Sequence, residues 1–443
     1  MSHAHEESSI LPQRSKELFV DRAVTQGLKR VRFLDVLRGV ALCGIFPVNI
    51  AYFALLTQLV DSYGVSLPLA DRVAREVTEG FFTFRFVTLF SFLFGVGIVL
   101  LMRKCERDRV SEGKVLFQRF FALLAFGAMH VLLLWYGDIL IYYAVLGILV
   151  VGIGVPYFSP RGQMVLAAIA FLFPVLLLAG PLLIFSNEGI ESVLFAEPEG
   201  DPAAERAAAL GASGEFTTSL FRLHPEFEAA VYREGSYGRQ MVLRVFTWIF
   251  AGFVGVLILL PRALGMFCFG IASAQHGWIL DPDRYRSAFL WCCVIGAAVG
   301  LPLQGVATWL WLGDASGKAV LAGVTLQYLA SLGMSAAYLG AVGLLCARET
   351  IPRWLRPFEA MGRMAFTQYI LQSILATGFF YAWGFAKFGQ LGFAELSVVV
   401  LGVWGVGLFT STLWLRKFRQ GPLEALWRRL TYFGVKPDLT PRS

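Results

Sequence analysis

Long apolar runs separated by short polar stretches dominate this chain from residue 34 to residue 415. A helix needs about 20 apolar residues to cross a hydrocarbon core that is about 30 Å thick. The pattern therefore predicts an all-α integral membrane protein, a polytopic bundle of about ten transmembrane helices. We expect these helices at 36–58, 81–102, 116–135, 138–156, 164–185, 250–276, 287–311, 320–346, 364–385 and 392–414.

Polar segments divide the chain into regions. Residues 1–33 are too long and too polar for a cleaved signal peptide, so we expect the first apolar run to remain as a membrane anchor. The remaining predicted regions are helices 1–5 within 34–186, a loop at 187–239, helices 6–10 within 240–415 and a tail at 416–443. One detail stays open, because 239–279 holds either one span after an interfacial helix or two pieces broken at Pro261.

Lysine and arginine are unevenly distributed among the polar loops. Six lie in 103–119, four in 347–363 and seven after residue 415. Since cytoplasmic loops carry an excess of these residues, both chain ends are predicted to be cytoplasmic. The acidic segment 187–239 then lies outside, as an ordered cap or a disordered loop. Apolar positions at i, i+3, i+4 and i+7 within 421–430 predict an interfacial amphipathic helix.

Composition supports the same class of protein. The chain is 57% hydrophobic and 16% charged, whereas a soluble domain carries about 25% charged residues. The net charge of +7 lies in the loops, which is a topology signal, so we expect lipid and not nucleic acid as the partner. The six cysteines show no CxxC or Cys/His spacing, and we expect no metal site.

Polar residues open the first predicted span. Asp35 and Arg38 are three residues apart, so they share a helix face and can pair. Asn49 returns to this face eleven residues after Arg38. Ionisable groups inside spans are costly and are candidates for function. The alternative is an ion pair that only fixes orientation at the inner interface.

Further ionisable groups fall in the predicted outer half of the bundle. Arg85 is deep enough to need a carboxylate or another polar partner, and Glu79 lies near the mouth of the same span. His130 is the one histidine clearly within a span, and Asp138 follows it across the tight hairpin at 136–137. Such a histidine either acts as a general base oriented by the carboxylate or is a neutral residue hydrogen-bonded inside the bundle.

The ninth predicted span carries Arg363, Gln368 and Gln372. The glutamines are four residues apart on one face, which favours interhelical hydrogen bonds. Arg363 and Arg38 are predicted near the inner surface. Together with Arg262 they would hold a phosphorylated ligand, or they would contact lipid headgroups.

Several of these stretches resemble a known family, the YeiB-like proteins. The residues that carry the resemblance are Arg32–Leu42 with Val48-Asn49-Ile50, Phe90–Gly95 and His130–Leu140. The second half resembles the domain of unknown function 418 at Gly362–Ala365 and Gly421–Glu424. The N-terminal signature is similar to that of the heparan-α-glucosaminide N-acetyltransferase-type transmembrane acyltransferases. The resemblance implies a multi-pass protein of the bacterial inner membrane.

The resemblance also implies a reaction, the transfer of an acyl group from cytoplasmic acyl-CoA to an extracytoplasmic sugar, lipid or small molecule. His130 would then be the general base and Asp138 would orient it or bind the acceptor. Arg85 and Asn49 would polarise the acyl carbonyl or hold the site together.

In the same interpretation, Arg38 and Arg363, with Asp35 beside them, would bind the phosphates of CoA at the inner face. Acyl-CoA would be a co-substrate, and we expect no tightly bound cofactor. A transporter or exporter of a small amphipathic solute is the main alternative, and a scaffold whose external loop binds a partner is a third. The formation of a homo-oligomer stays open.

Overall fold

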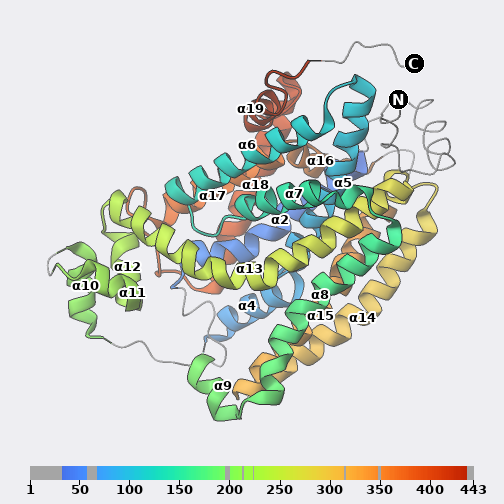
Figure 1. Cartoon of the computed structure of the whole chain (residues 1–443). Helices are drawn as coiled ribbons and strands as arrows, with labels where there is room; N and C mark the ends of the chain where they lie inside the picture. The colour runs from blue at the N-terminus through green and yellow to red at the C-terminus, as the bar shows by residue number, and fades with distance from the viewer. Residues whose placement is uncertain are drawn as a thin grey trace, which may run out of the picture.

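The computed structural model describes residues 32–56, 67–194, 200–211, 214–222, 224–313, 316–347 and 351–436. Within these ranges the regular elements are all helices and no strand occurs, which confirms the predicted all-α class (Figure 1). Eight helical segments are long and apolar enough to cross a membrane. They are α2 (Arg32–Ala54), α4 (Leu69–Phe81) continued by α5 (Arg85–Asp108), α6 (Glu112–Leu133), α8 (Pro160–Ile184), Gly255–His276 of α13 (Tyr237–His276), α14 (Arg286–Gly313), α15 (Gly317–Cys346) and α18 (Phe393–Lys417).

The fourth and ninth predicted spans are also helices, but they are short. α7 (Leu140–Ile153) has 14 residues and α17 (Ala365–Phe380) has 16. Neither reaches the length of about 20 residues that crosses a bilayer without tilt or thinning. The count of ten spans therefore stays a prediction, whereas a multi-pass helical membrane protein is established.

The second predicted span begins later than expected. It starts at Arg85 and not at residue 81, because Phe84 has a left-handed backbone with a φ of 64° that separates α4 from α5. α4 is a distinct amphipathic helix, and Glu79 belongs to it.

α13 is one continuous helix of 40 residues, which gives a length of about 60 Å. It passes through Pro261, so of the two alternatives for 239–279 the one with a break at this residue is wrong. A proline inside a helix removes one backbone hydrogen bond, and here the helix continues beyond it. The residues of α13 before Gly255 lie outside the apolar segment that is able to span a membrane.

The segment before α13 folds into short helices. α9 (Asn187–Leu194) lies beside α15, whereas α10 (Pro202–Leu210), α11 (Phe216–Arg222) and α12 (Pro225–Arg233) gather near the start of α13 (Figure 1). Tyr232 of α12 stacks on Tyr381, just after α17, with ring centroids 4.4 Å apart. Burial raises the pKa of Tyr232 well above its usual range, so its phenol stays neutral.

Glycines allow several helix pairs to approach closely. A Cβ atom at Gly95 of α5 would collide with the carbonyl oxygen of Phe267 in α13. A Cβ atom at Gly362 of α16 (Arg356–Arg363) would likewise collide with the carbonyl oxygen of Asp35 in α2. Close backbone contact at small residues is typical of helix packing in membranes. These crossings fix α13 and α16 against the first helices of the chain.

The three segments rich in lysine and arginine meet at one end of the bundle. We call this the basic end and define it by residues 103–119, 351–363 and 416–436. Arg32 at the start of α2 donates to Glu359 of α16 at 2.7 Å and 2.9 Å. Trp427 of α19 (Pro422–Thr431) donates to the carbonyl oxygen of Arg119 in α6 at 2.9 Å. The side of the membrane that this end faces stays a prediction.

α19 is the helix that was predicted to be amphipathic and interfacial. Its Glu424 carboxylate accepts hydrogen bonds from the backbone N–H groups of Phe366 at 2.7 Å and Thr367 at 3.0 Å. These are unsatisfied donors at the start of α17, where a negative charge is also favoured by the helix dipole. Leu426 and Leu430 of α19 remain exposed. The helix is therefore docked on α17 through one face and presents apolar residues on another.

Candidate functional site

Three polar side chains form a buried chain of contacts between α6, α7 and α17. The Nδ1 atom of His130 lies 2.9 Å from Oδ2 of Asp138, and both side chains have no solvent exposure. The Nε2 atom of His130 lies 2.9 Å from Oγ of Ser373. Ser373 is itself buried. The structure thus joins the two predicted residues to a third that lies 243 positions away from His130 in the sequence.

The hairpin between α6 and α7 positions the first two residues. α6 ends with the backbone N–H groups of Leu134 and Trp135 both donating to the carbonyl oxygen of His130. Asp138 then caps the start of α7, because its Oδ1 atom accepts from the N–H of Ile141 at 2.8 Å. One carboxylate therefore anchors α7 with one oxygen and contacts His130 with the other.

The Nδ1 atom of His130 faces a carboxylate oxygen and its Nε2 atom faces a hydroxyl. Which partner donates between Nε2 and the hydroxyl of Ser373 depends on the tautomer of the imidazole. In the tautomer with the proton on Nδ1, Nε2 is the acceptor and Ser373 the donor. A carboxylate, an imidazole and a hydroxyl in this order form the arrangement that activates a hydroxyl for attack on an acyl group.

Aromatic rings enclose the imidazole. The ring centroid of Tyr369 lies 5.1 Å from that of His130, and Trp135 contacts His130 edge-on. Trp135 in turn stacks on Phe53 of α2 at 3.9 Å. Apolar walls of this kind exclude water, and electrostatic interactions are stronger in such surroundings.

The site lies near the middle of α17, since Ser373 is the ninth residue of this 16-residue helix. The sequence placed His130 in the outer half of the bundle. The beginning of α13 covers the hairpin, because Tyr237 donates to the carbonyl oxygen of Leu133 at 2.5 Å and Arg244 donates to that of Leu132 at 2.9 Å. The beginning of α13 therefore packs against the end of α6, while the side chains of Leu132 and Leu133 stay exposed.

The other two predicted catalytic residues are Asn49 and Arg85. Asn49 is half-buried on α2, one turn before Phe53, so it points toward the same side as the ring that stacks on Trp135. Among the described residues, no hydrogen bond or ion pair connects Arg85 with His130.

Arg85 belongs to a second polar cluster, where it is fully buried. It donates to the carbonyl oxygen of Glu79 at 2.7 Å and to the side chain of Gln304 in α14. Arg85 was predicted to need a carboxylate or another polar partner, and its partners here are a neutral carbonyl and a neutral amide. The carboxylate of Glu79 instead accepts from Gln327 of α15 at 2.7 Å.

Arg262 was expected near the inner surface with Arg38 and Arg363, and this expectation is wrong. It is buried inside the bundle and donates to the hydroxyls of Thr88 at 2.7 Å and Ser331 at 2.6 Å. Because α13 continues for 14 residues after Arg262, the guanidinium lies about 21 Å from the end of its helix.

Arg363 and Arg38 both lie near the basic end, whose side of the membrane stays a prediction. Arg38 is 3.2 Å from the carboxylate of Asp35, which confirms the pair inferred from their spacing. Arg363 donates to the carbonyl oxygen of Arg419 at 2.9 Å. The glutamines of the ninth predicted span are both buried, and Gln368 donates to Thr410 of α18 at 3.3 Å, so the interhelical hydrogen bond is confirmed.

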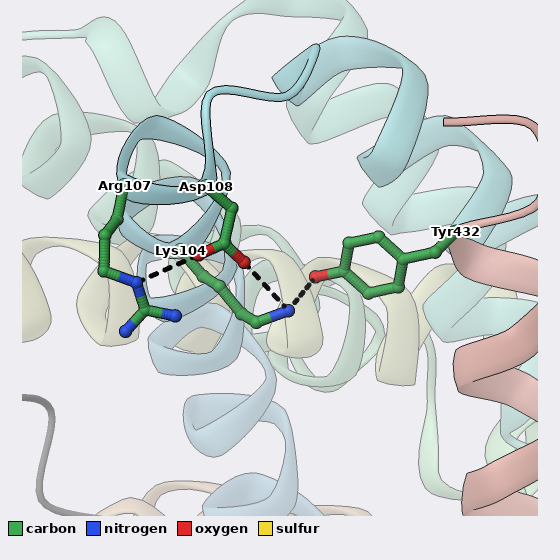
Figure 2. Close-up of polar contacts among 4 residues, drawn as sticks. All are labelled: Lys104, Arg107, Asp108 and Tyr432. Atoms are coloured by element: carbon green, nitrogen blue, oxygen red, sulfur yellow. Dashed lines mark hydrogen bonds and ion pairs between the residues drawn. The ribbon is translucent and has the colours of Figure 1, made fainter. Parts of the chain in front are cut away.

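An open cavity of about 610 Å³ lies at the basic end between α5 and α19. Figure 2 shows Lys104, whose Nζ atom lies 2.7 Å from the hydroxyl of Tyr432 and 3.4 Å from Asp108. Arg428 and Arg429 also line the cavity. The spacing of these basic residues predicts orientation only, and no signal in the sequence indicates that they line a cavity. In the described part of the chain, no cluster of three histidine, cysteine or carboxylate side chains could hold a metal ion.

Comparison with known proteins gives relatives over nearly the whole length. Residues 273–434 match the family model described as "Protein of unknown function (DUF418)". The chain is 28% identical to the uncharacterized protein YxaH of Bacillus subtilis, over 92% of this chain and 96% of the relative. It is also 28% identical to the uncharacterized protein YeiB of Escherichia coli, over 93% of this chain and 98% of the relative.

A third bacterial relative, the uncharacterized 39.9 kDa protein in the amylase 3′ region of Bacillus acidopullulyticus, is 26% identical over 94% of this chain and 97% of its own. The family model covers α17 and α19 but begins after α6, so it includes Ser373 and excludes His130. The full-length relatives extend the similarity across both parts of the site. The chain therefore matches the DUF418 family over residues 273–434 and is similar to YeiB and YxaH over nearly its whole length.

Proposed function

We propose that this protein is a membrane acyltransferase that moves an acyl group from acyl-CoA to an acceptor on the other side of the bacterial inner membrane. The observation that supports this proposal is the position of His130 between a buried carboxylate and a buried hydroxyl. General base catalysis requires a histidine within hydrogen-bond reach of the proton that it abstracts. With the proton on Nδ1, which faces Asp138, Nε2 would be the atom that accepts that proton.

The donor would approach from the basic end, which we take as cytoplasmic. The cavity lined by Lys104, Arg428 and Arg429 offers cationic groups for the phosphates of CoA. Arg38 and Arg363, with Asp35, would extend this surface. Acyl-CoA is then a co-substrate, and no tightly bound cofactor is needed.

The donor and the buried site are connected through α17. The start of this helix contacts α19, because Thr367 donates to Glu424. Ser373 follows six residues later, about 9 Å further along the helix axis. A phosphopantetheine arm is long enough to carry an acyl group over this distance while the nucleotide remains at the basic end. The acceptor, a sugar, a lipid or a small molecule, would enter from the opposite end.

The proposal is tested with the purified protein in lipid vesicles, supplied with acetyl-CoA or a longer acyl-CoA. The release of free CoA and the appearance of acylated acceptor in a membrane extract are measured. We expect His130→Gln to lower the rate about 10²- to 10⁴-fold, the usual contribution of a general base. His276→Gln is the matched control, since His276 is bonded only to a carbonyl oxygen of its own helix at the end of α13.

A His130→Gln protein that is as stable as the wild type and still releases CoA at the wild-type rate would contradict the proposal. Transport is distinguished in the same vesicles. A transporter would move a solute across the membrane without acyl-CoA, whereas the acyltransferase leaves no acylated product when acyl-CoA is omitted.

A further inference from the structure

We propose that Ser373 is a nucleophile that carries the acyl group as an ester between donor and acceptor. The proposal rests on the proposed function, but it adds a covalent intermediate and a catalytic residue. Direct transfer would use His130 only to activate the acceptor. In the structure, the hydroxyl that His130 contacts is one of the protein's own.

The geometry of Ser373 fits this role. Its Oγ atom lies 2.9 Å from Nε2 of His130, whereas its contact with the carbonyl oxygen of Tyr369 is longer, at 3.3 Å. In the proposed step the imidazole carries its proton on Nδ1, which lies 2.9 Å from Asp138, and Nε2 accepts the serine proton. A nucleophile within hydrogen-bond reach of a base, with a third group orienting the base, is the arrangement that activates a serine.

The burial of the site also favours a covalent intermediate. The side chains of His130 and Asp138 have no solvent exposure, and Ser373 is 2% exposed. In direct transfer, donor and acceptor would have to reach His130 at the same time from opposite ends of the bundle. A covalent intermediate near the middle of α17 needs each substrate only in turn. The dry surroundings would protect the ester from hydrolysis.

The steps balance without a further reactant. Oγ of Ser373 attacks the thioester carbonyl, the carbon–sulfur bond breaks, and His130 passes the serine proton to the departing CoA thiolate. The products of this step are free CoA and an acyl ester of Ser373. A hydroxyl or amine of the acceptor then attacks the ester, the bond to Oγ breaks, and His130 returns the acceptor's proton to Ser373.

The nucleophile is tested independently of the acyl donor with an alkyl fluorophosphonate, which reacts with activated serines by losing fluoride. We expect an adduct that peptide mass spectrometry assigns to Ser373 in the full-length protein in vesicles. Ser373→Ala and His130→Gln should lose the adduct. Ser411→Ala removes another buried serine, from α18, and should keep it. Equal labelling of the wild type and Ser373→Ala, or no labelling of either, would overturn the assignment.

The intermediate is tested with acyl-CoA in the absence of acceptor. The wild type should gain one acyl group per chain, on Ser373, and Ser373→Cys should gain it as a thioester that hydroxylamine removes. The covalent step is wrong, and the proposed function stands, if two results are found together. The wild type acylates an acceptor without forming an adduct, and Ser373→Ala acylates the acceptor at the wild-type rate. If neither acceptor nor Ser373 is acylated, both are wrong.

Discussion

Asp138→Asn is the substitution whose effect follows most directly from the site geometry. Oδ1 of this carboxylate accepts from the N–H of Ile141 at 2.8 Å, and Oδ2 lies 2.9 Å from Nδ1 of His130. An asparagine has only one acceptor oxygen, so its NH₂ group must face one of these two nitrogens. If the NH₂ group faces Nδ1, the imidazole proton moves to Nε2, and Ser373 loses its acceptor.

The size of the effect can be worked out from these contacts. The substitution removes one hydrogen bond to a charged group in a fully buried site, which corresponds to about 1.5–3 kcal/mol of unfolding free energy. The change of tautomer should lower acyl transfer by as much as about 10⁴-fold, the loss seen when the carboxylate of a serine protease triad is replaced in this way. Asp283→Asn makes the same chemical change at an exposed position and should alter neither quantity.

The assay is unfolding in mixed micelles by SDS titration, combined with CoA release in vesicles. A double-mutant cycle with His130→Gln separates the pairwise interaction from general damage. Because a single substitution leaves a buried partner unmatched, the double variant should lose less unfolding free energy than the sum of the two single variants. Additive losses, or an Asp138→Asn protein that matches Asp283→Asn in both assays, would refute the assigned contacts.

Three further predictions concern the scaffold. Gly95→Ala should lose about 1–3 kcal/mol of unfolding free energy in SDS titration, because the new methyl group pushes α5 away from α13. Gly97→Ala, on the same helix with open space around it, should gain up to about 1 kcal/mol, and equal effects would contradict the crossing. Glu424→Gln should cost about 1 kcal/mol at the start of α17 and expose α19 to limited proteolysis, and an unchanged cleavage pattern would contradict the docking. Arg262→Lys should lower the unfolding temperature, since an ammonium group cannot reproduce the directed bonds of the guanidinium, and an unchanged transition would contradict this network.

Local features of the site could be predicted from the sequence. Asp35 and Arg38 pair because three residues bring side chains to one helix face, and this follows from helix geometry alone. His130 and Asp138 meet because a short turn separates them, so their proximity follows from the hairpin. The helical class follows from the apolar runs, since a chain in lipid must satisfy its backbone within helices or closed barrels.

Contacts between distant helices could not be predicted in this way. Ser373 is one serine among many, and nothing in its own surroundings indicates that it faces a residue 243 positions away. Nor does the sequence around Gln304 indicate that this residue is the partner of Arg85. Arg262 was grouped with Arg38 and Arg363, but it lies inside the bundle and bonds to Thr88 and Ser331. Each of these depends on which helices become neighbours, and hydrophobic periodicity does not encode that choice.

The separation of the site residues along the chain has a consequence for biosynthesis. A ribosome that adds about 5–20 residues per second needs roughly 10–50 s to travel the 243 positions from His130 to Ser373. During this interval the hairpin is already inserted, but the imidazole has no serine to activate. If Ser373 carries the acyl group as proposed, a chain that ends before α17 cannot form the ester. A partly built protein would then consume no acyl donor by this route.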